Sequence, residues 1–336
     1  MIELDISHFS GSYASLNGNA QPFSVSKFDI GRAIITIGYL SIFRAFRQTN
    51  FFRILELLSK PLAYFEVLNN SLVLNSTFHG LEKTEKVINS FYFGQAFTKL
   101  FAENKLKCIW VDNVQNQTAN IIYNMSNVSF TPKLKLNSTN DAGSEPDLIG
   151  FGTNNNFHVM EAKGYSSGYN VTEHQKAINQ VSRVTTVNGI SPDTRDACFF
   201  DLSGNPIKGN IIDPENNESL FNIEFKVNDF LSSYYSIFNF DLEKLDRPLW
   251  KLKANNYEFL VFQIGYPYIF LGVYLELYEN VIKNDTFQYI GEILPLEIKI
   301  LEFPNIIDYS LGRDGILLIQ LKSNSNLGIF ANRTIF

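Results

Sequence analysis

Three charged residues stand close together in an otherwise apolar part of the chain, between positions 144 and 164. Asp147 follows Pro146, and Glu161 and Lys163 are separated by a single residue within an apolar run. Buried or half-buried charges are costly unless they pair with one another, bind a metal or take part in a reaction. These three residues are therefore the first candidates for a functional site.

A pair of strands is expected to bring the three residues together. Residues 148–151 and 157–163 are apolar runs separated by a turn rich in Asn, which is typical of a hairpin. Residues two apart in a strand face the same side of a sheet, so Glu161 and Lys163 should share one face. Asp147 opens the first strand, and we expect its carboxylate to lie beside Glu161.

The chemistry that this arrangement predicts is metal-assisted attack on a phosphate. Two carboxylates at one position repel each other and raise each other's pKa unless a cation lies between them. Mg²⁺ is the hard cation that one or two carboxylates hold together with waters and a phosphate. We therefore predict a Mg²⁺ (or Mn²⁺) site at Asp147 and Glu161. Lys163 could orient a water or help to deprotonate it, while the metal stabilises the charge that builds on the phosphate.

The surrounding sequence predicts a mixed α/β core with a sheet flanked by helices. Residues 81–104 have the apolar spacing of a long helix, and residues 107–111 and 197–202 are short apolar runs that we expect to be strands. A second helix is expected over 172–187, because Thr172 and Gln175 have the spacing of a capping box. Residues 50–60 are expected to be helical, and the beginning of the chain to be strand-like.

The pattern Pro146-Asp147, followed by Glu161-Ala162-Lys163 on the next strand, resembles the signature of the PD-(D/E)XK nuclease superfamily. That superfamily includes many restriction endonucleases, DNA-repair nucleases and phage-defence effectors. The resemblance covers residues 81–214 and includes the order of the elements. It implies a restriction-endonuclease-like fold and a metal-dependent nuclease, acting on DNA in a bacterial restriction or phage-defence setting.

The resemblance also implies roles for individual residues. Asp147 and Glu161 would be metal ligands together with the backbone carbonyl of Ala162, and Lys163 would serve the attacking water. Gln180 stands where the family often has a helical Gln or Lys that points into the site.

The chain departs from the family pattern on the first helix. Many members have a Glu there, whereas this chain has Gln95, with Glu103 two turns later. The resemblance therefore leaves the presence of a second metal ion open.

Composition limits the class of protein. The chain has 336 residues, of which 45% are hydrophobic, so it can build a sizeable core. Its net charge of −6 gives no general basic field for nucleic acid, although a local basic groove would suffice. With only two cysteines it has no disulfide framework, which fits a reducing cytoplasm.

The regions outside the 81–214 core lie on both sides of it, at residues 1–80 and 215–336. Residues 1–80 have no predicted role, and the acidic beginning of the chain lacks the basic segment of a secretory signal. Residues 215–336 are rich in expected strands and would serve recognition or oligomerisation, as a homodimer or with a partner protein of a defence system. The expected strands in this region are residues 257–262, 268–277, 297–303 and 315–321.

Several alternatives remain open at this stage. Glu161 and Lys163 could form an ion pair at a strand edge, Asp147 could cap a turn, and Gln180 could be a surface residue. The Gln at position 95 would suit a catalytically inactive binding or scaffold protein that keeps the nuclease fold. The apolar run of residues 259–275 could associate with a membrane, but its glycines and proline favour two buried strands instead. Motifs for a serine-hydrolase elbow or a nucleotide-binding P-loop do not occur.

Overall fold

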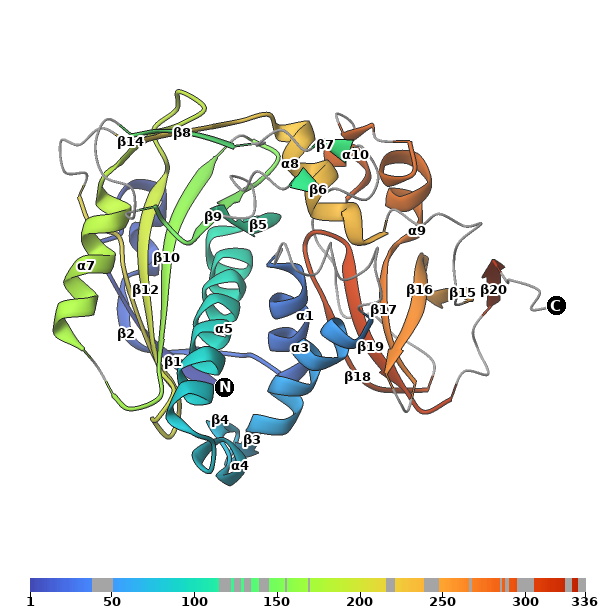
Figure 1. Cartoon of the computed structure of the whole chain (residues 1–336), viewed down its shortest axis with the longest axis horizontal. Helices are drawn as coiled ribbons and strands as arrows, with labels where there is room; N and C mark the ends of the chain where they lie inside the picture. The colour runs from blue at the N-terminus through green and yellow to red at the C-terminus, as the bar shows by residue number, and fades with distance from the viewer. Residues whose placement is uncertain are drawn as a thin grey trace.

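The computed structural model contains two large β-sheets with helices packed between them and on the outside (Figure 1). A seven-stranded sheet lies on one side of the molecule, and a six-stranded sheet that carries the C-terminal strands lies on the other. The structure describes residues 1–37, 51–114, 122–123, 128–129, 134–138, 145–154, 156–168, 170–215, 221–238, 248–265, 268–284, 286–287, 290–294, 305–323 and 328–331.

The seven-stranded sheet is mixed. Its strands, in spatial order, are β2 (Gly18–Phe23), β1 (Ile2–Ser7), β13 (Lys208–Ile212), β12 (Thr194–Asp201), β10 (Phe157–Tyr165), β9 (Leu148–Phe151) and β5 (Trp110–Asn113). The pairs β10–β12 and β1–β13 are parallel, and the others are antiparallel. The N-terminal strands therefore belong to the same sheet as the predicted hairpin, which is present as β9 and β10.

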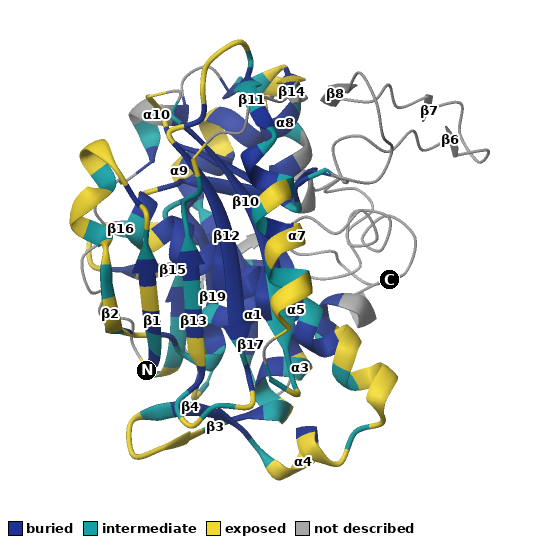
Figure 2. Ribbon diagram, turned by 90° about the vertical axis from the view of Figure 1, so that its left-hand side faces the viewer, coloured by how far each residue is buried: buried dark blue, intermediate teal, exposed yellow. Residues whose placement is uncertain are grey.

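Helices cover both faces of this sheet. On one face lies α5 (Lys83–Phe101), where Phe97 packs 5.1 Å from Phe200 of β12 between ring centroids. On the other lies α7 (Val171–Ser182), whose buried apolar side chains pack with Phe199. Because Phe199 and Phe200 are neighbours in one strand, they point to opposite faces. Figure 2 shows β10 and β12 buried along most of their length, with the exposed side of α7 turned outward.

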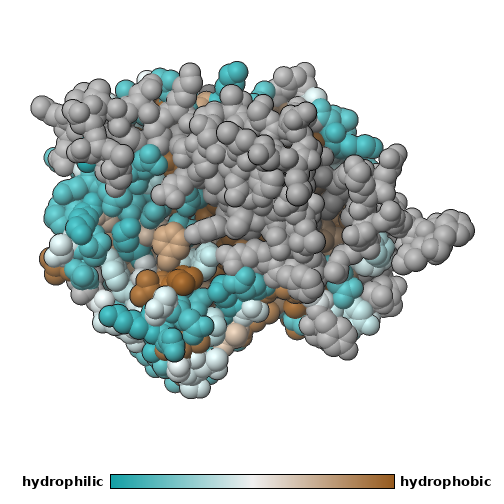
Figure 3. All heavy atoms as spheres, in the orientation of Figure 1, coloured by the Kyte–Doolittle hydropathy of each residue, from teal (hydrophilic) through white to brown (hydrophobic). Residues whose placement is uncertain are grey.

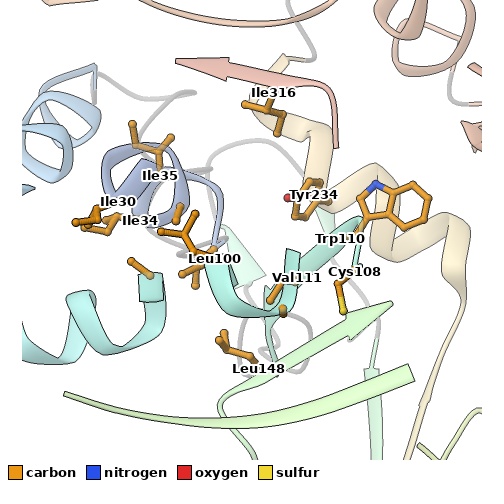
Figure 4. Close-up of a cluster of buried hydrophobic side chains, with 14 of the residues drawn as sticks. Ile30, Ile34, Ile35, Leu100, Cys108, Trp110, Val111, Leu148, Tyr234 and Ile316 are labelled. Carbon is orange, nitrogen blue, oxygen red and sulfur yellow. The ribbon is translucent and has the colours of Figure 1, made fainter. Parts of the chain in front are cut away.

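The second sheet is joined to the first through α1 (Lys27–Thr36) and α3 (Phe51–Tyr64), which lie between α5 and the C-terminal strands (Figure 1). Figure 4 shows apolar side chains of α1, α5, β5, β9 and β19 meeting in one buried cluster. The six strands, in spatial order, are β18 (Ile306–Leu311), β19 (Ile316–Leu321), β17 (Ile269–Tyr274), β16 (Tyr257–Gly265), β15 (Leu249–Ala254) and β20 (Gly328–Ala331).

Smaller elements complete the described chain. The additional strands are β3 (Phe65–Leu68), β4 (Ser71–Leu74), β6 (Ile122–Tyr123), β7 (Val128–Ser129), β8 (Leu134–Ser138), β11 (Val184–Val187) and β14 (Phe221–Phe225). The short helices and turns are η1 (Gly11–Leu16), α4 (Ser76–His79), η2 (Ala102–Leu106), α8 (Val227–Tyr234), η3 (Tyr235–Phe238), α9 (Leu275–Leu277), η4 (Tyr278–Ile282) and α10 (Ile290–Ile293).

The predicted helix over 172–187 is wrong at both ends. It begins one residue earlier, because the side chain of Asn170, rather than Thr172, accepts hydrogen bonds from the first free amides. It ends at Ser182, and residues 184–187 form β11, which pairs with β14 in a small separate sheet. The β-branched run Val184-Thr-Thr-Val187 fits a strand better than a helix.

The bounds of two other expected strands differ from those in the structure. The strand expected at 107–111 lies at 110–113, because η2 extends the preceding helix to Leu106. The strand expected over 268–277 ends at Tyr274, where α9 follows, and the strand β18 was not anticipated. The expected strand at 297–303 lies outside the described residues.

The apolar run of residues 259–275 forms the antiparallel strands β16 and β17, as predicted. In the described part of the chain, no helix is long and apolar enough to span a membrane. Figure 3 shows one face of the molecule. On the part of this face that the structure describes, hydrophobic residues form small patches among hydrophilic ones. The exposed apolar residues include Val87 and Ile88 near the beginning of α5.

Candidate active site

The end of the β9–β10 hairpin brings Asp147 and Glu161 together. The two strands pair up to Leu148 opposite Met160, and one residue further on the backbone amide of Asp147 donates to Glu161 Oε2 at 3.0 Å. In return the amide of Ala162 donates to Asp147 Oδ2, also at 3.0 Å. Each carboxylate is therefore fixed by a backbone amide of the other strand, and the predicted proximity is confirmed.

Lys163 lies between the two carboxylates. Its ammonium donates to Glu161 Oε1 and lies 3.8 Å from Asp147 Oδ2. Glu161 and Lys163 share a face because they are two apart in β10. The lysine therefore supplies one positive charge to a pair of two carboxyl groups.

The three side chains of the cluster differ in how far they are exposed to solvent. The Glu161 side chain is only 1% exposed, that of Asp147 is 17% exposed, and that of Lys163 is 26% exposed. A ligand from solvent would therefore meet Lys163 and Asp147 first, with Glu161 behind them.

The electrostatics favour the binding of a cation. Burial, and then the nearby Asp147 carboxylate, raise the pKa of Glu161 from 4.5 to about 8. Burial also raises the pKa of Asp147, although Lys163 opposes this. For Lys163 itself, burial lowers the pKa, but the two carboxylates outweigh it and the net shift is upward. An additional positive charge at the carboxylates would relieve the cost of ionising both.

Pro146 cannot donate a backbone hydrogen bond to the facing residue of β10. Continuing the β9–β10 register by two residues puts Pro146 opposite Ala162. Every second facing pair of an antiparallel ladder exchanges N–H and C=O bonds, but proline has no N–H to give. The Ala162 amide donates to Asp147 instead, and its carbonyl, on the same side of β10, has no proline donor. The proline therefore explains how this carbonyl could serve as a ligand.

The residues present fit a hard divalent cation. Asp147, Glu161 and the Ala162 carbonyl offer only oxygen atoms, which Mg²⁺ and Mn²⁺ prefer. Groups of three or more His, Cys, Asp or Glu side chains suited to a metal are not found in the described ranges. The donor set thus fits an ion that keeps several of its waters, and it does not resemble a zinc site.

Gln180 is adjacent to the cluster rather than part of it. Its side-chain amide donates to the backbone carbonyl of Glu145 at 3.3 Å, two residues before Asp147. Lys176, one turn earlier in α7, is paired with Glu173, and its side chain is 63% exposed. Gln180 therefore holds the segment that carries Asp147, and no recorded contact joins it to the three charged side chains.

Helix α5 is the first helix of the 81–214 core. Within the described residues, no recorded contact joins one of its carboxylates to this site. Gln95 is buried, and its Nε2 lacks a hydrogen-bond partner within the described residues. Glu103 forms a buried ion pair with Arg32 of α1 and lies 3.7 Å from Lys99. Its recorded bonds thus go to a separate cluster.

The tyrosines that follow Lys163 and the histidine in the first turn of α7 have no recorded hydrogen bond or ion pair with the three charged side chains within the described residues. Tyr165 packs against a small apolar group formed by α7 and β12, and Tyr169 lies outside the described residues. His174 lies against Phe199, with ring centroids 3.6 Å apart. Sequence reasoning missed Gly164, which has no side chain and lets α5 approach β10 directly after Lys163. A glycine next to a candidate catalytic lysine was the available signal.

Comparisons of the chain with protein-family models, with curated proteins and with solved structures found no match.

Proposed function

We propose that this chain is a metal-dependent nuclease that hydrolyses phosphodiester bonds in DNA, and that the seven-stranded sheet is a restriction-endonuclease-like core of the PD-(D/E)XK superfamily. The observation that carries the proposal is the meeting of Asp147, Glu161 and Lys163 at the end of one hairpin, with reciprocal amide bonds between the strands. A structural ion pair needs only one carboxylate. Here two carboxyl groups share one lysine, and a divalent cation would let both of them ionise despite their burial.

Asp147 and Glu161 would hold the ion, with the Ala162 carbonyl as a third oxygen donor. When bound, Mg²⁺ or Mn²⁺ would neutralise charge on the phosphate and lower the pKa of a water molecule. Lys163, the most exposed of the three side chains, would donate hydrogen bonds to the attacking water or to a phosphate oxygen. As the water oxygen bonds to phosphorus and releases a proton to solvent, the bond to the leaving sugar oxygen breaks, and that oxygen takes up a proton from solvent.

Gln180 and the backbone would keep the acid pair in position. Gln180 holds the Glu145 carbonyl, and the Ala162 amide holds Asp147 Oδ2. Exact placement of reacting groups matters for rate, since small displacements are costly. The helix α7 would thus act on the site through Glu145 rather than through contact with substrate.

The biological setting is proposed from the resemblance. A role in bacterial restriction or phage defence, and action as a homodimer or with a partner protein, would give the C-terminal sheet a task in recognition or oligomerisation. Both cysteines, Cys108 and Cys198, are buried free thiols in the structure. That state suits a reducing compartment such as the cytoplasm.

One observation favours a second candidate function. Lys163 already satisfies Glu161, so the cluster could be a self-contained ion pair in a catalytically inactive scaffold. The absence of a Glu at position 95 points the same way. The two candidates differ in whether the cluster binds metal and cleaves substrate.

Cleavage of supercoiled plasmid DNA by the purified chain tests the proposal. The assay compares Mg²⁺, Mn²⁺ and EDTA, with a structured RNA as a second substrate. The key variant is Lys163→Gln, and Lys176→Gln is its matched control, because Lys176 loses the same charge from an exposed pair on α7. We expect metal-dependent nicking or linearisation that Lys163→Gln reduces by about 10²-fold or more, while Lys176→Gln stays near wild type. Equal activity of both lysine variants, or cleavage that persists in EDTA, would contradict the proposal, and cleavage of RNA alone would correct its substrate.

A further inference from the structure

A small polar cavity lies away from the candidate active site, between the beginning of α1, the end of α5 and the turn that joins β18 to β19. Its volume is about 120 Å³. That is close to the roughly 150 Å³ of a cavity that holds benzene, so a group of about five or six non-hydrogen atoms would fit. The polar residues that line it are Ser24, Asp29, Arg32, Glu103, Asn104 and Arg313.

The two carboxylates of this cavity are already bonded. Glu103 accepts from Arg32 Nη1 at 3.1 Å and from its Nη2, with Lys99 Nζ at 3.7 Å. Asp29 accepts from the amide of Ser26 at 2.8 Å and from Ser310 Oγ at 2.7 Å. Their negative charges are therefore held by donors of the protein, and neither is a vacant acceptor for an incoming cation.

Arg313 is different from every other charged group of the cavity. Its Nε is buried and has no hydrogen-bond partner within the described residues. Within the same residues, Arg313 also forms no recorded ion pair. It lies in the turn between β18 and β19, next to Asp314, whose carboxylate accepts from Tyr234 and lies 3.9 Å from Lys99. An arginine that lines the cavity thus carries one buried donor without a partner in the described residues, and a buried unsatisfied donor of this kind is unfavourable.

We propose that this cavity binds a single phosphate group, with Arg313 as the residue that recognises it. The planar guanidinium presents several N–H donors in a fork that matches phosphate oxygens, and the cavity has room for one tetrahedral oxyanion. Asn104 and Ser24 line the same space and offer uncharged polar atoms. Free inorganic phosphate and the phosphate of a nucleotide share this chemistry. The proposal is independent of nuclease activity, because none of the residues that line the cavity belongs to the Asp147–Glu161–Lys163 cluster.

Isothermal titration calorimetry of the full chain tests this site, with EDTA present so that phosphate cannot bind through a metal. The ligands are inorganic phosphate, a nucleoside 5′-monophosphate and acetate. The variant Arg313→Gln removes the donor, and Lys322→Gln is its control, because Lys322 loses one positive charge at the exposed opposite end of β19. Asn104→Asp is a second variant that adds a negative charge to the cavity wall and keeps the size of the side chain.

We expect one phosphate group per chain, an affinity at least about tenfold weaker in Arg313→Gln and in Asn104→Asp, and no change in Lys322→Gln. Acetate, which lacks the tetrahedral oxygens, should bind more weakly than phosphate. Binding of the nucleotide but not of inorganic phosphate would support the site and identify its source. Failure of both phosphate ligands to bind, or equal affinity of the wild type and Arg313→Gln, would overturn the proposal without bearing on the nuclease.

Discussion

Gly94 of α5 lies directly against Gly164 of β10, the residue that follows Lys163. A Cβ added to Gly94 would lie 2.6 Å from the amide nitrogen of Gly164, and one added to Gly164 would lie 2.0 Å from the backbone oxygen of Ser90. Real Cβ atoms do not approach so closely, so any side chain here would push α5 away from the strand that carries the candidate site. The contact couples the packing of the long helix to the position of Lys163.

Substituting Gly164 should therefore harm both stability and activity. We expect Gly164→Ala to lower the free energy of unfolding by about 1–3 kcal/mol, because backbone atoms must shift to admit the methyl group. The matched control is Gly80→Ala, where the added Cβ would lie 3.5 Å from its nearest neighbour, an ordinary contact. Urea denaturation of the two variants checks this, and an unfolding free energy of Gly164→Ala close to that of Gly80→Ala would contradict it.

The buried pair of Arg32 and Glu103 should be expensive to break. Their side chains are each 3% exposed, so Glu103→Ala would leave a buried guanidinium without its main partner. We expect a loss of about 3–5 kcal/mol in the free energy of unfolding. Glu56→Ala removes an acid from the pair Glu56–Lys60 on α3, where the Glu56 side chain is 49% exposed. A difference of less than about 1 kcal/mol is expected there, and equal losses from the two variants would refute the expectation.

The pH dependence of stability should report on His158. Burial lowers the pKa of this histidine from 6.5 to about 4. The unfolded chain therefore takes up a proton near pH 6.5 while the folded chain does not. The contribution is fully present above pH 6.5 and is lost as the pH falls toward 4, by up to roughly 3 kcal/mol in total.

His158→Gln should flatten this acid limb, which denaturant titrations between pH 7 and pH 4.5 would measure. The buried Asp196, whose pKa is raised well above its usual value by burial, contributes in the opposite direction, and Thr194 links it to His158 by hydrogen bonds to both. A slope unchanged in His158→Gln would show that the histidine does not titrate as described.

Asn170 and Thr172 are two candidates for the residue that caps the N-terminus of α7. Asn170 Oδ1 accepts from the amides of Thr172 and Glu173 at 3.0 and 3.3 Å. Asn170→Ala should therefore lower the free energy of unfolding by about 0.5–2 kcal/mol. Thr172→Ala, at an exposed position, should change it by only about a few tenths of a kcal/mol. Thermal unfolding of the two variants would decide, and the reverse order of stabilities would restore Thr172 as the cap.

Helices and strands could be predicted from sequence where neighbouring residues determine them. The β9–β10 hairpin was predicted because apolar runs flank a turn of Asn residues, and the facing of Glu161 and Lys163 follows from the period of a strand. The end of α7 was missed because residues 184–187 pair with β14, more than thirty residues away in the chain. A strand partner at that distance leaves no trace in local spacing.

The site itself was predicted in part for the same reason. Asp147, Glu161 and Lys163 meet as expected, because one hairpin positions all three. The target of Gln180 was not predictable, since its contact with Glu145 depends on how α7 packs on the sheet. The pairing of Arg32 with Glu103 joins residues 71 positions apart and likewise depends on tertiary packing.

The most direct test of the account is an equilibrium titration of the metal-free protein with Mn²⁺, followed by calorimetry or by the electron paramagnetic resonance of the free ion. Glu161→Gln removes one proposed ligand, and Glu173→Gln is its control, because it makes the same change in an exposed pair on α7. We expect binding by the wild type and by Glu173→Gln, with at least about tenfold weaker binding by Glu161→Gln. A wild-type protein that binds no Mn²⁺, or a Glu161→Gln variant that binds it equally well, would contradict the metal site and with it the proposed nuclease.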